Sequence, residues 1–298
     1  MKVFVTGATG FIGSAVVQEL LKHGHQVLGL ARNEEAAEKL KAAGAEVHRG
    51  DLNDTESLKA GSNASDGTIH LGFIHDFTRF AEVCAIDKAA IESMGEQLIG
   101  TDKPFLVTSG TAVASRDGIL TEKDRVQSSP NPRTATELAV DTLASKGVKV
   151  AAVRLPPSVH GVGDAHGFIP ILVNMAREKG VSAMINEGLN KWPAVNRMDA
   201  AIVFRLALEK LTEPGTRFHA VDDQGVPFRL IADKIAKGLD VEVKSVTTEE
   251  AEADFTWFTH FAMFNNLTSS EATQKTLGWK PSHPSLLEDL DNGFYFQK

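Results

Sequence analysis

Three glycines near the amino terminus have the spacing of a turn that binds phosphate groups. The run Val5-Thr6-Gly7-Ala8-Thr9-Gly10-Phe11-Ile12-Gly13 follows a short apolar segment and leads into a segment with helical periodicity. One glycine lets the chain reverse tightly, one lets the backbone approach a pyrophosphate, and one lets the helix pack on the strand. The start of the helix offers free N–H groups and a partial positive charge to the phosphates. The pattern predicts a dinucleotide site made by Thr6, Gly7, Thr9, Gly10, Phe11, Ile12 and Gly13.

The residues after the second predicted strand, residues 25–31, favour NADP(H) as the dinucleotide. A site that prefers NAD usually places Asp or Glu there, to accept hydrogen bonds from the ribose hydroxyls. This chain has Arg32 followed by Asn33. A guanidinium matches a 2′-phosphate with charge-assisted hydrogen bonds that each contribute about 1.5–3 kcal/mol. The alternative is that Arg32 is an ordinary solvated side chain.

Polar side chains suited to proton transfer or charge stabilisation follow other predicted strands. Asp76 follows residues 67–72, Ser109 ends residues 104–109 and Thr111 follows them, and His160 and Asp164 follow residues 148–155. Carboxylates stabilise a positive charge by preorganised electrostatics, and histidine exchanges protons near neutral pH. We expect Asp164 to be the main catalytic carboxylate, with His160 as proton donor. Asp76 is a second carboxylate, and Ser109 and Thr111 are expected to donate to substrate or to the nicotinamide carboxamide.

Each of these assignments has a simpler alternative. Asp164 follows a glycine and is equally typical of a turn residue, and His160 is equally typical of a loop histidine bonded to backbone. The single cysteine, Cys84, lies in an apolar-periodic stretch and is expected to be a buried structural thiol. His70 and His75 lie in or after a buried strand and are expected to be satisfied core histidines. No spacing of histidine, cysteine and carboxylates indicates a metal site.

The elements that must position these residues alternate between strands and helices. Strand-like segments cover residues 1–5, 25–31, 45–49, 67–72, 104–109 and 148–155, and helical patterns lie between them. This alternation predicts an α/β fold, a Rossmann doubly wound parallel sheet covered on both faces. Its ligand crevice lies beyond the carboxyl ends of the strands. Further cofactor contacts are therefore expected from Asp51, Leu52, Leu71, Gly72, Thr108, Ser109, Pro156, Ser158 and Val159. Asp51 either accepts from the adenine amino group or caps the helix after it.

The composition changes near residue 165 and predicts a second unit. Residues 1–164 are expected to form the dinucleotide-binding domain. Residues 165–298 are expected to form mainly a small α/β substrate-binding subdomain, with some return to the sheet. The large aromatic side chains of this region predict either an apolar lid over a ligand or the core of the subdomain: Trp192, Trp257, Phe258, Phe261, Phe264 and Tyr295.

Bulk properties exclude several classes of partner. The net charge is −8 and no block of lysine and arginine occurs, which argues against nucleic acid and anionic membranes. No apolar run approaches the ~20 residues that span a bilayer. Because a strand is predicted from the first residues, we expect no signal peptide, and the single cysteine fits a reducing compartment. We expect a cytoplasmic protein with a small-molecule substrate.

Several motifs together resemble the extended short-chain dehydrogenase/reductase and NAD-dependent epimerase/dehydratase superfamily. They are the glycine run, Gly50-Asp51-Leu52, Ile69-His70-Leu71, Leu106-Val107-Thr108-Ser109, Val153-Arg154-Leu155-Pro156 and Leu277-Gly278-Trp279-Lys280-Pro281. The resemblance covers nearly the whole chain. It implies a Rossmann sheet with a small carboxyl-terminal substrate domain. It also implies a homodimer seam, which residues 80–99 and 134–143 would form.

The chain departs from this family at its usual catalytic pair. The resemblance implies Tyr-x-x-x-Lys on the helix after the fifth strand, where tyrosine passes a proton and lysine lowers the pKa of that tyrosine. Here Arg133 stands at the tyrosine position and Glu137 at the lysine position, and the only tyrosine is Tyr295. Arginine stays protonated and cannot act as a general acid or base. Arg133 is expected to hold the cofactor or to orient Asp164, or else to form a surface pair with Glu137.

Atypical members of the superfamily keep the cofactor loop without the tyrosine, and some are reductases of imines. Reduction of an iminium ion gives a neutral amine without added acid, whereas a ketone gives an alkoxide that needs a proton. The sequence therefore favours an NADPH-dependent reductase of a C=N bond, or of a C=O bond, in a bulky apolar small molecule. The alternatives are a nucleotide-sugar epimerase or dehydratase and a non-catalytic NADP(H) sensor.

Overall fold

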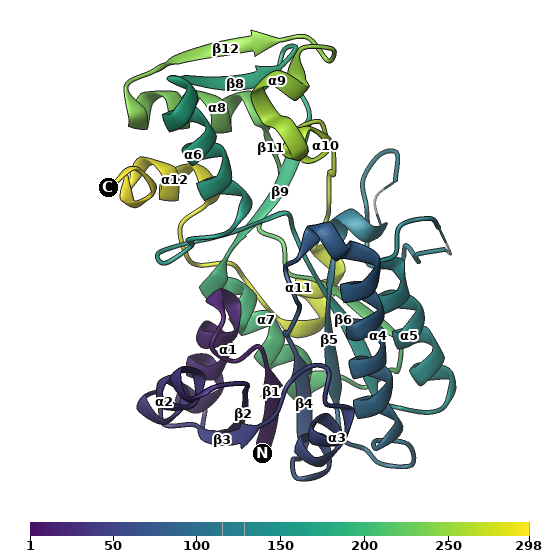
Figure 1. The fold of residues 1–298 in the computed structure, drawn as a ribbon. Coiled ribbons are helices and arrows are strands. Elements are labelled where there is room, and N and C mark those ends of the chain that lie inside the picture. Colours follow the sequence, from purple (N-terminus) through teal and green to yellow (C-terminus); the bar gives the residue numbers. More distant parts are fainter. Residues whose placement is uncertain (115, 128, 298) are drawn as a thin grey trace.

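A seven-stranded parallel sheet forms the centre of the larger lobe, with strand order β10-β6-β5-β4-β1-β2-β3. The computed structural model describes residues 1–114, 116–127 and 129–297 (Figure 1). The strands of this sheet are β1 (Lys2–Thr6), β2 (Gln26–Ala31), β3 (Glu46–Arg49), β4 (Gly67–His70), β5 (Phe105–Gly110), β6 (Val150–Leu155) and β10 (Thr216–His219). The predicted Rossmann sheet is therefore confirmed, with one more strand than the sequence suggested.

Helices cover both faces of this sheet. One face carries α1 (Phe11–Lys22), α2 (Glu34–Ala42) and α7 (Arg197–Lys210), whose apolar side chains share a core with β1. The other face carries α3 (Thr55–Asn63), α4 (Phe80–Glu96) and α5 (Thr134–Ser145). Because both faces are covered, strand β6 is an almost continuous run of buried residues. Helices α4 and α5 pack side by side (Figure 1), and the homodimer seam expected of them stays a prediction.

A smaller lobe lies beyond the carboxyl ends of these strands (Figure 1). Its strands are β7 (Ser158–His160), β8 (Val181–Ile185), β9 (Lys191–Asn196), β11 (Asp223–Pro227) and β12 (Glu242–Val246). Its longer helices are α6 (Phe168–Lys179) and α8 (Phe228–Leu239), and its shorter ones are α9 (Ala251–Phe255), η3 (Thr256–Phe258), α10 (Thr259–Ala262), α12 (Leu286–Asp291) and η4 (Phe294–Phe296). A separate apolar cluster centred on Trp192 and Phe228 fills this lobe.

The division between the lobes does not follow the chain at residue 164. Helix α7, strand β10 and α11 (Glu271–Leu277) all come after that residue and belong to the larger lobe. Strand β10 extends the sheet next to β6, and α7 packs along α1. The expected return to the sheet thus involves complete elements. None of the described helices is long and apolar enough to cross a bilayer.

Candidate functional site

The glycine turn joins β1 to α1 at the edge of the sheet that faces the smaller lobe. Gly7 has a φ of +64°, and a Cβ added there would lie 2.7 Å from the backbone nitrogen of Gly72. A Cβ on Gly13 would lie 2.0 Å from the carbonyl oxygen of Gly7. Gly10 is exposed and is the N-cap of α1, with no side-chain cap among the described residues. The backbone of the turn therefore packs closely against Gly72 at Gly7 and against itself at Gly13. The first N–H groups of α1 have no side-chain cap among the described residues.

These features fit a dinucleotide. Only glycine fits at positions 7 and 13, and the uncapped helix end provides hydrogen-bond donors for a pyrophosphate. Leu71, Val159 and Leu52 are half-buried at strand ends nearby, as a ligand-lining role requires. Pro156 and Ser158 are buried, so any contact that they make with a cofactor would come from backbone or a small part of the side chain.

The side chain of Thr6 faces inward and anchors the glycine turn. Its hydroxyl oxygen accepts hydrogen bonds from the N–H groups of Leu71 and Gly72, at 3.2 and 3.1 Å. It also lies 2.7 Å from Nδ1 of His70. Because the oxygen already accepts twice, its hydrogen donates to Nδ1, and we assign the imidazole hydrogen to Nε2. Thr6 is fully buried, so its predicted part in cofactor binding is to hold the turn.

Asp87 of α4 continues this chain of hydrogen bonds toward α5. Its Oδ1 lies 3.2 Å from Nε2 of His70, and its Oδ2 accepts from Arg133 Nη1 at 2.6 Å and from Thr136 Oγ1 at 2.6 Å. Burial favours the neutral acid, but the His70 hydrogen bond and the charge of Arg133 outweigh it and lower the pKa of Asp87. His70 is thus a satisfied core histidine, as expected. Asp87 is a residue that the sequence reasoning missed.

Arg133 lies at the start of α5 with its side chain 15% exposed. Besides Asp87, its guanidinium donates to Thr136 Oγ1 at 2.8 Å and to the carbonyl oxygen of Thr108 at 3.4 Å. It stacks on the ring of Phe73, 4.1 Å from the ring centroid. Arg133 is therefore fixed where β4 and β5 end, at the crevice of the sheet.

Glu137, one turn further along α5, has entirely different surroundings. Its carboxylate accepts from Arg154 at 3.0 Å and from Arg217 Nε at 2.8 Å, and all three side chains are 0% exposed. Burial raises the pKa of Glu137, but the hydrogen bond and charge of Arg154 and the charge of Arg217 lower it to about 2. The prediction of a surface pair between Arg133 and Glu137 is wrong, because each side chain has its charged partners on other elements.

Ser109 and Thr111 do not take the positions expected of them. Ser109 is buried, and its hydroxyl lies near Glu137 and contributes weakly to the lowered pKa of that carboxyl. It has no hydrogen bond of ordinary geometry among the described residues. Thr111 begins the turn η2 (Thr111–Ala114), is fully buried, and also lacks a described partner. The expected donation of these hydroxyls to a substrate has no support, because both face the protein interior.

Asp164 lies in the loop after β7 and is bound to the end of the chain. Its Oδ1 accepts from the N–H of Gly167 at 2.9 Å, and its Oδ2 accepts from the hydroxyl of Tyr295 at 3.0 Å. Burial raises the pKa of Asp164, and burial with the charge of Asp164 raises the pKa of Tyr295. The expectation that Arg133 orients Asp164 is wrong, since Tyr295 and Gly167 do so. The role of Asp164 as a catalytic carboxylate stays a prediction.

His160 is the last residue of β7, and its side chain is buried. Its Nδ1 lies 2.6 Å from a carboxylate oxygen of Asp289, which fixes the hydrogen on Nδ1. The ring is 0% exposed, and its Nε2 has no partner among the described residues. The imidazole is thus enclosed by the protein and held by Asp289. Its predicted role as proton donor to a ligand is therefore not supported, and the backbone-bonded loop histidine is also wrong.

Asp76 serves as a helix cap. Its carboxylate accepts from Thr78, through the N–H at 3.1 Å and the hydroxyl at 2.5 Å, at the start of η1 (Phe77–Arg79). The Thr78 hydroxyl lowers the pKa of Asp76. These local bonds explain Asp76 without a ligand. His75 is exposed, so the expectation of a core histidine there is wrong, whereas Cys84 is the buried free thiol that was predicted.

Arg32 and Asp51 lie at the edge where an adenosine would bind. Arg32 is exposed beside Glu35 of α2, to whose lowered pKa it contributes after Lys39. Asp51 accepts from Asn53 at 2.9 Å, and the N-cap of α3 is Asp54. The alternative that Asp51 caps this helix is therefore wrong. The proposed contacts of Arg32 with a 2′-phosphate and of Asp51 with adenine stay predictions.

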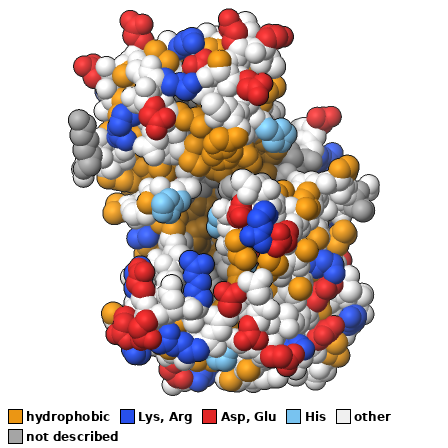
Figure 2. Space-filling view, in the orientation of Figure 1, with side chains coloured by type: hydrophobic (Ala, Val, Ile, Leu, Met, Phe, Trp, Pro, Cys, Tyr) orange, Lys and Arg blue, Asp and Glu red, His pale blue; other side chains and the backbone are white. Residues whose placement is uncertain are grey.

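Two recesses border this region. A cavity of about 190 Å³ lies between α1 and α2, lined by Ala8, Thr9, Ser14, Val17, Gln18, Lys39, Leu40 and Ala43. It therefore reaches the glycine turn itself. Figure 2 shows a hollow between the two lobes, with hydrophobic side chains gathered along the lower edge of the smaller lobe. Of the aromatics predicted for a lid, Trp192 and Phe258 are buried core, whereas Trp257 is 57% exposed.

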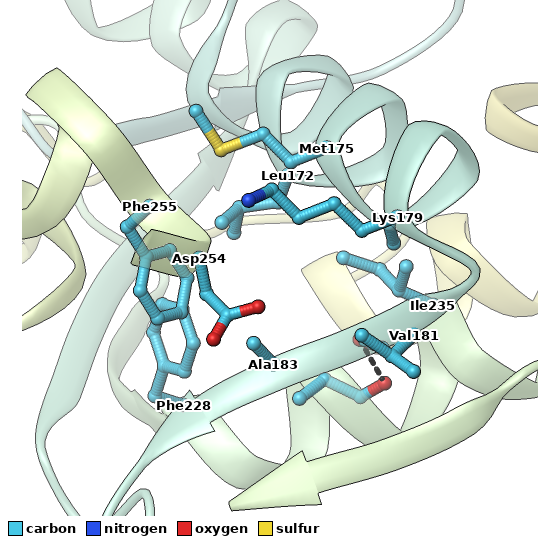
Figure 3. Close-up of a pocket in the computed structure, with 12 residues that line it drawn as sticks. Leu172, Met175, Lys179, Val181, Ala183, Phe228, Ile235, Asp254 and Phe255 are labelled. Atoms are coloured by element: carbon cyan, nitrogen blue, oxygen red, sulfur yellow. Dashed lines mark hydrogen bonds between the residues drawn. The ribbon is translucent and has the colours of Figure 1, made fainter. Parts of the chain in front are cut away.

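A third cavity lies inside the smaller lobe, away from the glycine turn. It holds about 20 Å³ and is bordered by Leu172, Phe228, Phe255, Lys179 and Asp254 (Figure 3). Asp254 pairs with Lys244 at 3.0 Å, and Lys179 bonds the carbonyl oxygen of Ala253. This volume suits about one water molecule. We interpret it as a packing gap between α6 and α8.

Arg197 is a second residue that the sequence reasoning missed. It begins α7 directly after β9, and its guanidinium lies over the ring of Phe11, 4.9 Å from the centroid. The sequence signal was a basic residue at the end of a buried segment, Trp192-Pro193-Ala194-Val195.

The parallel sheet, with a glycine turn after its first strand, defines a Rossmann dinucleotide-binding fold. The pattern of the NAD dependent epimerase/dehydratase family matches residues 3–219, and the chain belongs to this family. A dTDP-glucose 4,6-dehydratase from Bacillus anthracis, solved in complex with NAD, has a similar fold, with a TM-score of 0.74 and 15% identity over 99% of this chain and 96% of that one.

Relatives are similar over most of their length. An uncharacterized protein of Schizosaccharomyces pombe is 50% identical over 99% of this chain and 100% of its own. Another, from Saccharomyces cerevisiae, is 47% identical over 97% of this chain and 98% of its own. The 2-alkyl-3-oxoalkanoate reductase of Stenotrophomonas maltophilia is 28% identical over 79% of this chain and 74% of its own. Relatives with named activities thus include an oxidoreductase.

Proposed function

We propose that the protein is an NADPH-dependent reductase of a C=N bond, or secondarily of a C=O bond, in a bulky apolar small molecule. The observation that carries this proposal is the guanidinium of Arg133, which Asp87 holds at the crevice where the family pattern places a tyrosine. The cofactor, when bound, supplies the hydride. The residues of this chain position the reactants and provide the charge environment.

The preference for C=N follows from the absence of a proton donor at Arg133. Hydride addition to an iminium carbon breaks the C=N π bond, whose electron pair becomes the lone pair of a neutral amine. Hydride addition to a ketone leaves an alkoxide, which must be protonated. Without a general acid this reduction is slower by about 10²–10⁴-fold. Because Asp87 neutralises Arg133 at 2.6 Å, the pair does not repel a cationic substrate.

Tyr295 is a poor substitute for the missing acid. Its hydroxyl already donates to Asp164 and accepts from the N–H of Gly161 at 3.2 Å. Burial raises its pKa, so releasing this proton is harder than for a free tyrosine. Both properties favour a structural role for Tyr295.

The apolar substrate class is supported by the hydrophobic side chains that Figure 2 shows along the lower edge of the smaller lobe, at the hollow. Hydrophobic side chains exposed together at a cleft are typical of a ligand-binding groove. The preference for NADPH rests on Arg32.

The test is single-turnover oxidation of NADPH by a panel of substrates. The panel contains a cyclic imine that is protonated to its iminium ion at the assay pH, the ketone of the same carbon skeleton, and UDP-glucose. We expect the imine to oxidise NADPH about 10²-fold or more faster than the ketone, and UDP-glucose to be inert. A ketone that reacts as fast as the imine would contradict the preference for C=N.

Two further outcomes separate the alternatives. Turnover of UDP-glucose would indicate a nucleotide-sugar enzyme. Tight NADPH binding without oxidation by any substrate would indicate a sensor. The cofactor preference is tested in the same preparation with Arg32→Ala, which we expect to weaken NADPH about 10-fold and to leave NADH unchanged. Equal binding of both dinucleotides to the unmodified protein would contradict the choice of NADPH.

A further inference from the structure

We propose that Arg197 binds the pyrophosphate of the dinucleotide, so that the first turn of α7 completes the phosphate site that the glycine turn begins. This inference rests on the proposed function, because it takes NADPH to be the ligand. It adds a residue from the second half of the chain to a site otherwise built by the first thirteen residues.

The position of Arg197 is set by α1. Its Nη1 lies 3.4 Å from the carbonyl oxygen of Phe11, and its guanidinium stacks on the Phe11 ring at 4.9 Å. Phe11 is the first residue of α1, whose N-cap is the exposed Gly10. The guanidinium therefore lies beside the uncapped N–H groups that the phosphates would approach.

The loop after β7 forms the other wall around Arg197. Strand β7 pairs with β9 so that His160 lies opposite Asn196, and the two strands end together. A Cβ added to Gly161 would lie 3.5 Å from Cγ of Arg197, and one added to Gly163 would lie 3.6 Å from its Nη1. Both glycines have positive φ values, of +135° and +90°. The loop is thus shaped to pass close to the guanidinium.

Arg197 differs from every other arginine of the described interior. Four more arginines are buried or half-buried there, and each has a carboxylate oxygen within 3.0 Å: Arg133, Arg154, Arg205 and Arg217. Arg197 has no carboxylate partner among the described residues. A partly desolvated cation is costly unless an anion accompanies it.

The acids closest to Arg197 along the neighbouring segments are already in use. Asp199 accepts hydrogen bonds from the N–H groups of Ser282 and His283, and lies 2.9 Å from Nδ1 of His283. Asp164 is bonded to Gly167 and Tyr295. The missing counter-ion is therefore expected from a ligand, and the contact with Phe11 identifies the pyrophosphate beside α1 as that anion.

The experiment measures dissociation constants of NADPH by quenching of the protein's intrinsic fluorescence. Arg197→Met removes the charge and keeps an apolar chain that packs on Phe11, and Arg197→Lys keeps the charge. Arg177→Met is the matched control, because Arg177 of α6 also lacks a described carboxylate partner and bonds only Asn174 and the carbonyl oxygen of Phe296. Adenosine 2′-monophosphate, which has no pyrophosphate, is the second ligand.

We expect Arg197→Met to weaken NADPH by about 10- to 100-fold and to leave adenosine 2′-monophosphate and the thermal midpoint unchanged. Arg197→Lys should lose less, since a lysine cannot bind in bidentate fashion, and Arg177→Met should bind normally. If Arg197→Met fails to fold, the dissociation constant of NADPH for Arg197→Lys is the deciding measurement. Unchanged NADPH binding by Arg197→Lys would then overturn the inference.

Other outcomes assign failure to one proposal or the other. Unchanged NADPH binding by Arg197→Met, together with a raised KM for the imine, would indicate that Arg197 binds an anionic group of the substrate. This result would overturn the inference and would not contradict the proposed reductase activity. Equal weakening of adenosine 2′-monophosphate would also overturn it. An unmodified protein that binds neither NADPH nor NADH would instead remove the proposed function.

Discussion

Two carboxylate–guanidinium clusters lie one helical turn apart on α5, and they differ in what surrounds them. At Arg133 the guanidinium is 15% exposed and pairs with Asp87, beside the ends of β4 and β5. At Glu137 the carboxylate and both of its arginines are 0% exposed, beneath β6 and β10. The first cluster borders the crevice, and the second does not.

The difference shows that two positions one turn apart on the same helix have distinct roles. Glu137 is an internal brace, because it joins α5 to two strands of the sheet through Arg154 and Arg217. Arg133 borders the crevice and carries a fixed charge there. We therefore expect substitutions at 137 to change stability and those at 133 to change chemistry.

The largest effect on stability is expected from Glu137→Gln. It leaves the buried Arg154 without a described carboxylate partner and Arg217 with Asp141 alone, at 2.9 Å. Removal of one partner of a buried ion pair typically costs about 3–5 kcal/mol. Urea unfolding of the variant measures this loss. The control is Glu35→Gln, because Glu35 pairs with Lys39 on the surface at 2.7 Å and its side chain is 75% exposed; that change should stay within about 0.5 kcal/mol. Similar losses in both variants would contradict the brace.

The same carboxyl gives a pH dependence. In the folded protein the pKa of Glu137 is lowered from 4.5 to about 2. A lowered carboxyl pKa stabilises the fold above pH 4.5, and this stability is lost as the pH falls from 4.5 toward 2. The amount is about 3 kcal/mol. Urea unfolding at a series of pH values should show this decline in the unmodified protein and a flatter curve in Glu137→Gln. Parallel curves for the two proteins would contradict the assignment of this pH dependence to Glu137.

A smaller effect is expected from Asp87→Asn at the crevice cluster. The amide keeps the shape and some hydrogen bonds, but Arg133 and His70 lose their charged acceptor, a loss of about 1–3 kcal/mol. Because Arg133 is partly exposed, water compensates for part of this change. Thermal unfolding of Asp87→Asn and Glu137→Gln under the same conditions compares the contributions of the two clusters to stability. A greater loss in Asp87→Asn than in Glu137→Gln would reverse the assignment of the brace.

The smallest effect is expected at Asp222, a carboxyl with no guanidinium partner in the described part of the chain. Burial, with the charges of Asp223 and Asp199, raises the pKa of Asp222 to about 6. A raised carboxyl pKa stabilises the fold fully below the unfolded value of 3.8, and that contribution is lost as the pH rises toward 6. Asp222→Asn should therefore increase stability at pH 7 relative to pH 4, by about 1 kcal/mol after allowance for partial exposure. Equal changes in the free energy of unfolding at pH 4 and pH 7 would contradict a raised pKa of Asp222.

Local patterns were sufficient to predict most of the fold. Glycine spacing and the apolar periods of β1 and α1 depend on neighbouring residues, so the turn at Gly7 was predictable. Strand β10 was not, because its four residues join the sheet through pairing with β6, more than sixty positions earlier.

The site was harder to predict because its decisive contacts are distant in sequence. Arg133 binds a carboxylate 46 positions away, and Glu137 binds an arginine 80 positions away. The family resemblance singled out Arg133, but the sequence did not indicate which acid would hold it. His160 and Ser109 were expected at the crevice from their place after strands, yet their side chains face the interior, where Asp289 and Glu137 lie.

The most direct test of the account is the single-turnover rate of NADPH oxidation by a cyclic imine in Arg133→Met, at saturating NADPH. The account predicts a decrease of about 10²-fold, because Arg133 is expected to hold the cofactor in position for hydride transfer, and a misplacement of about 1 Å has this effect. Arg133→Lys should be affected less. An unchanged rate in a folded Arg133→Met protein would contradict the claim that this end of α5 faces the chemistry.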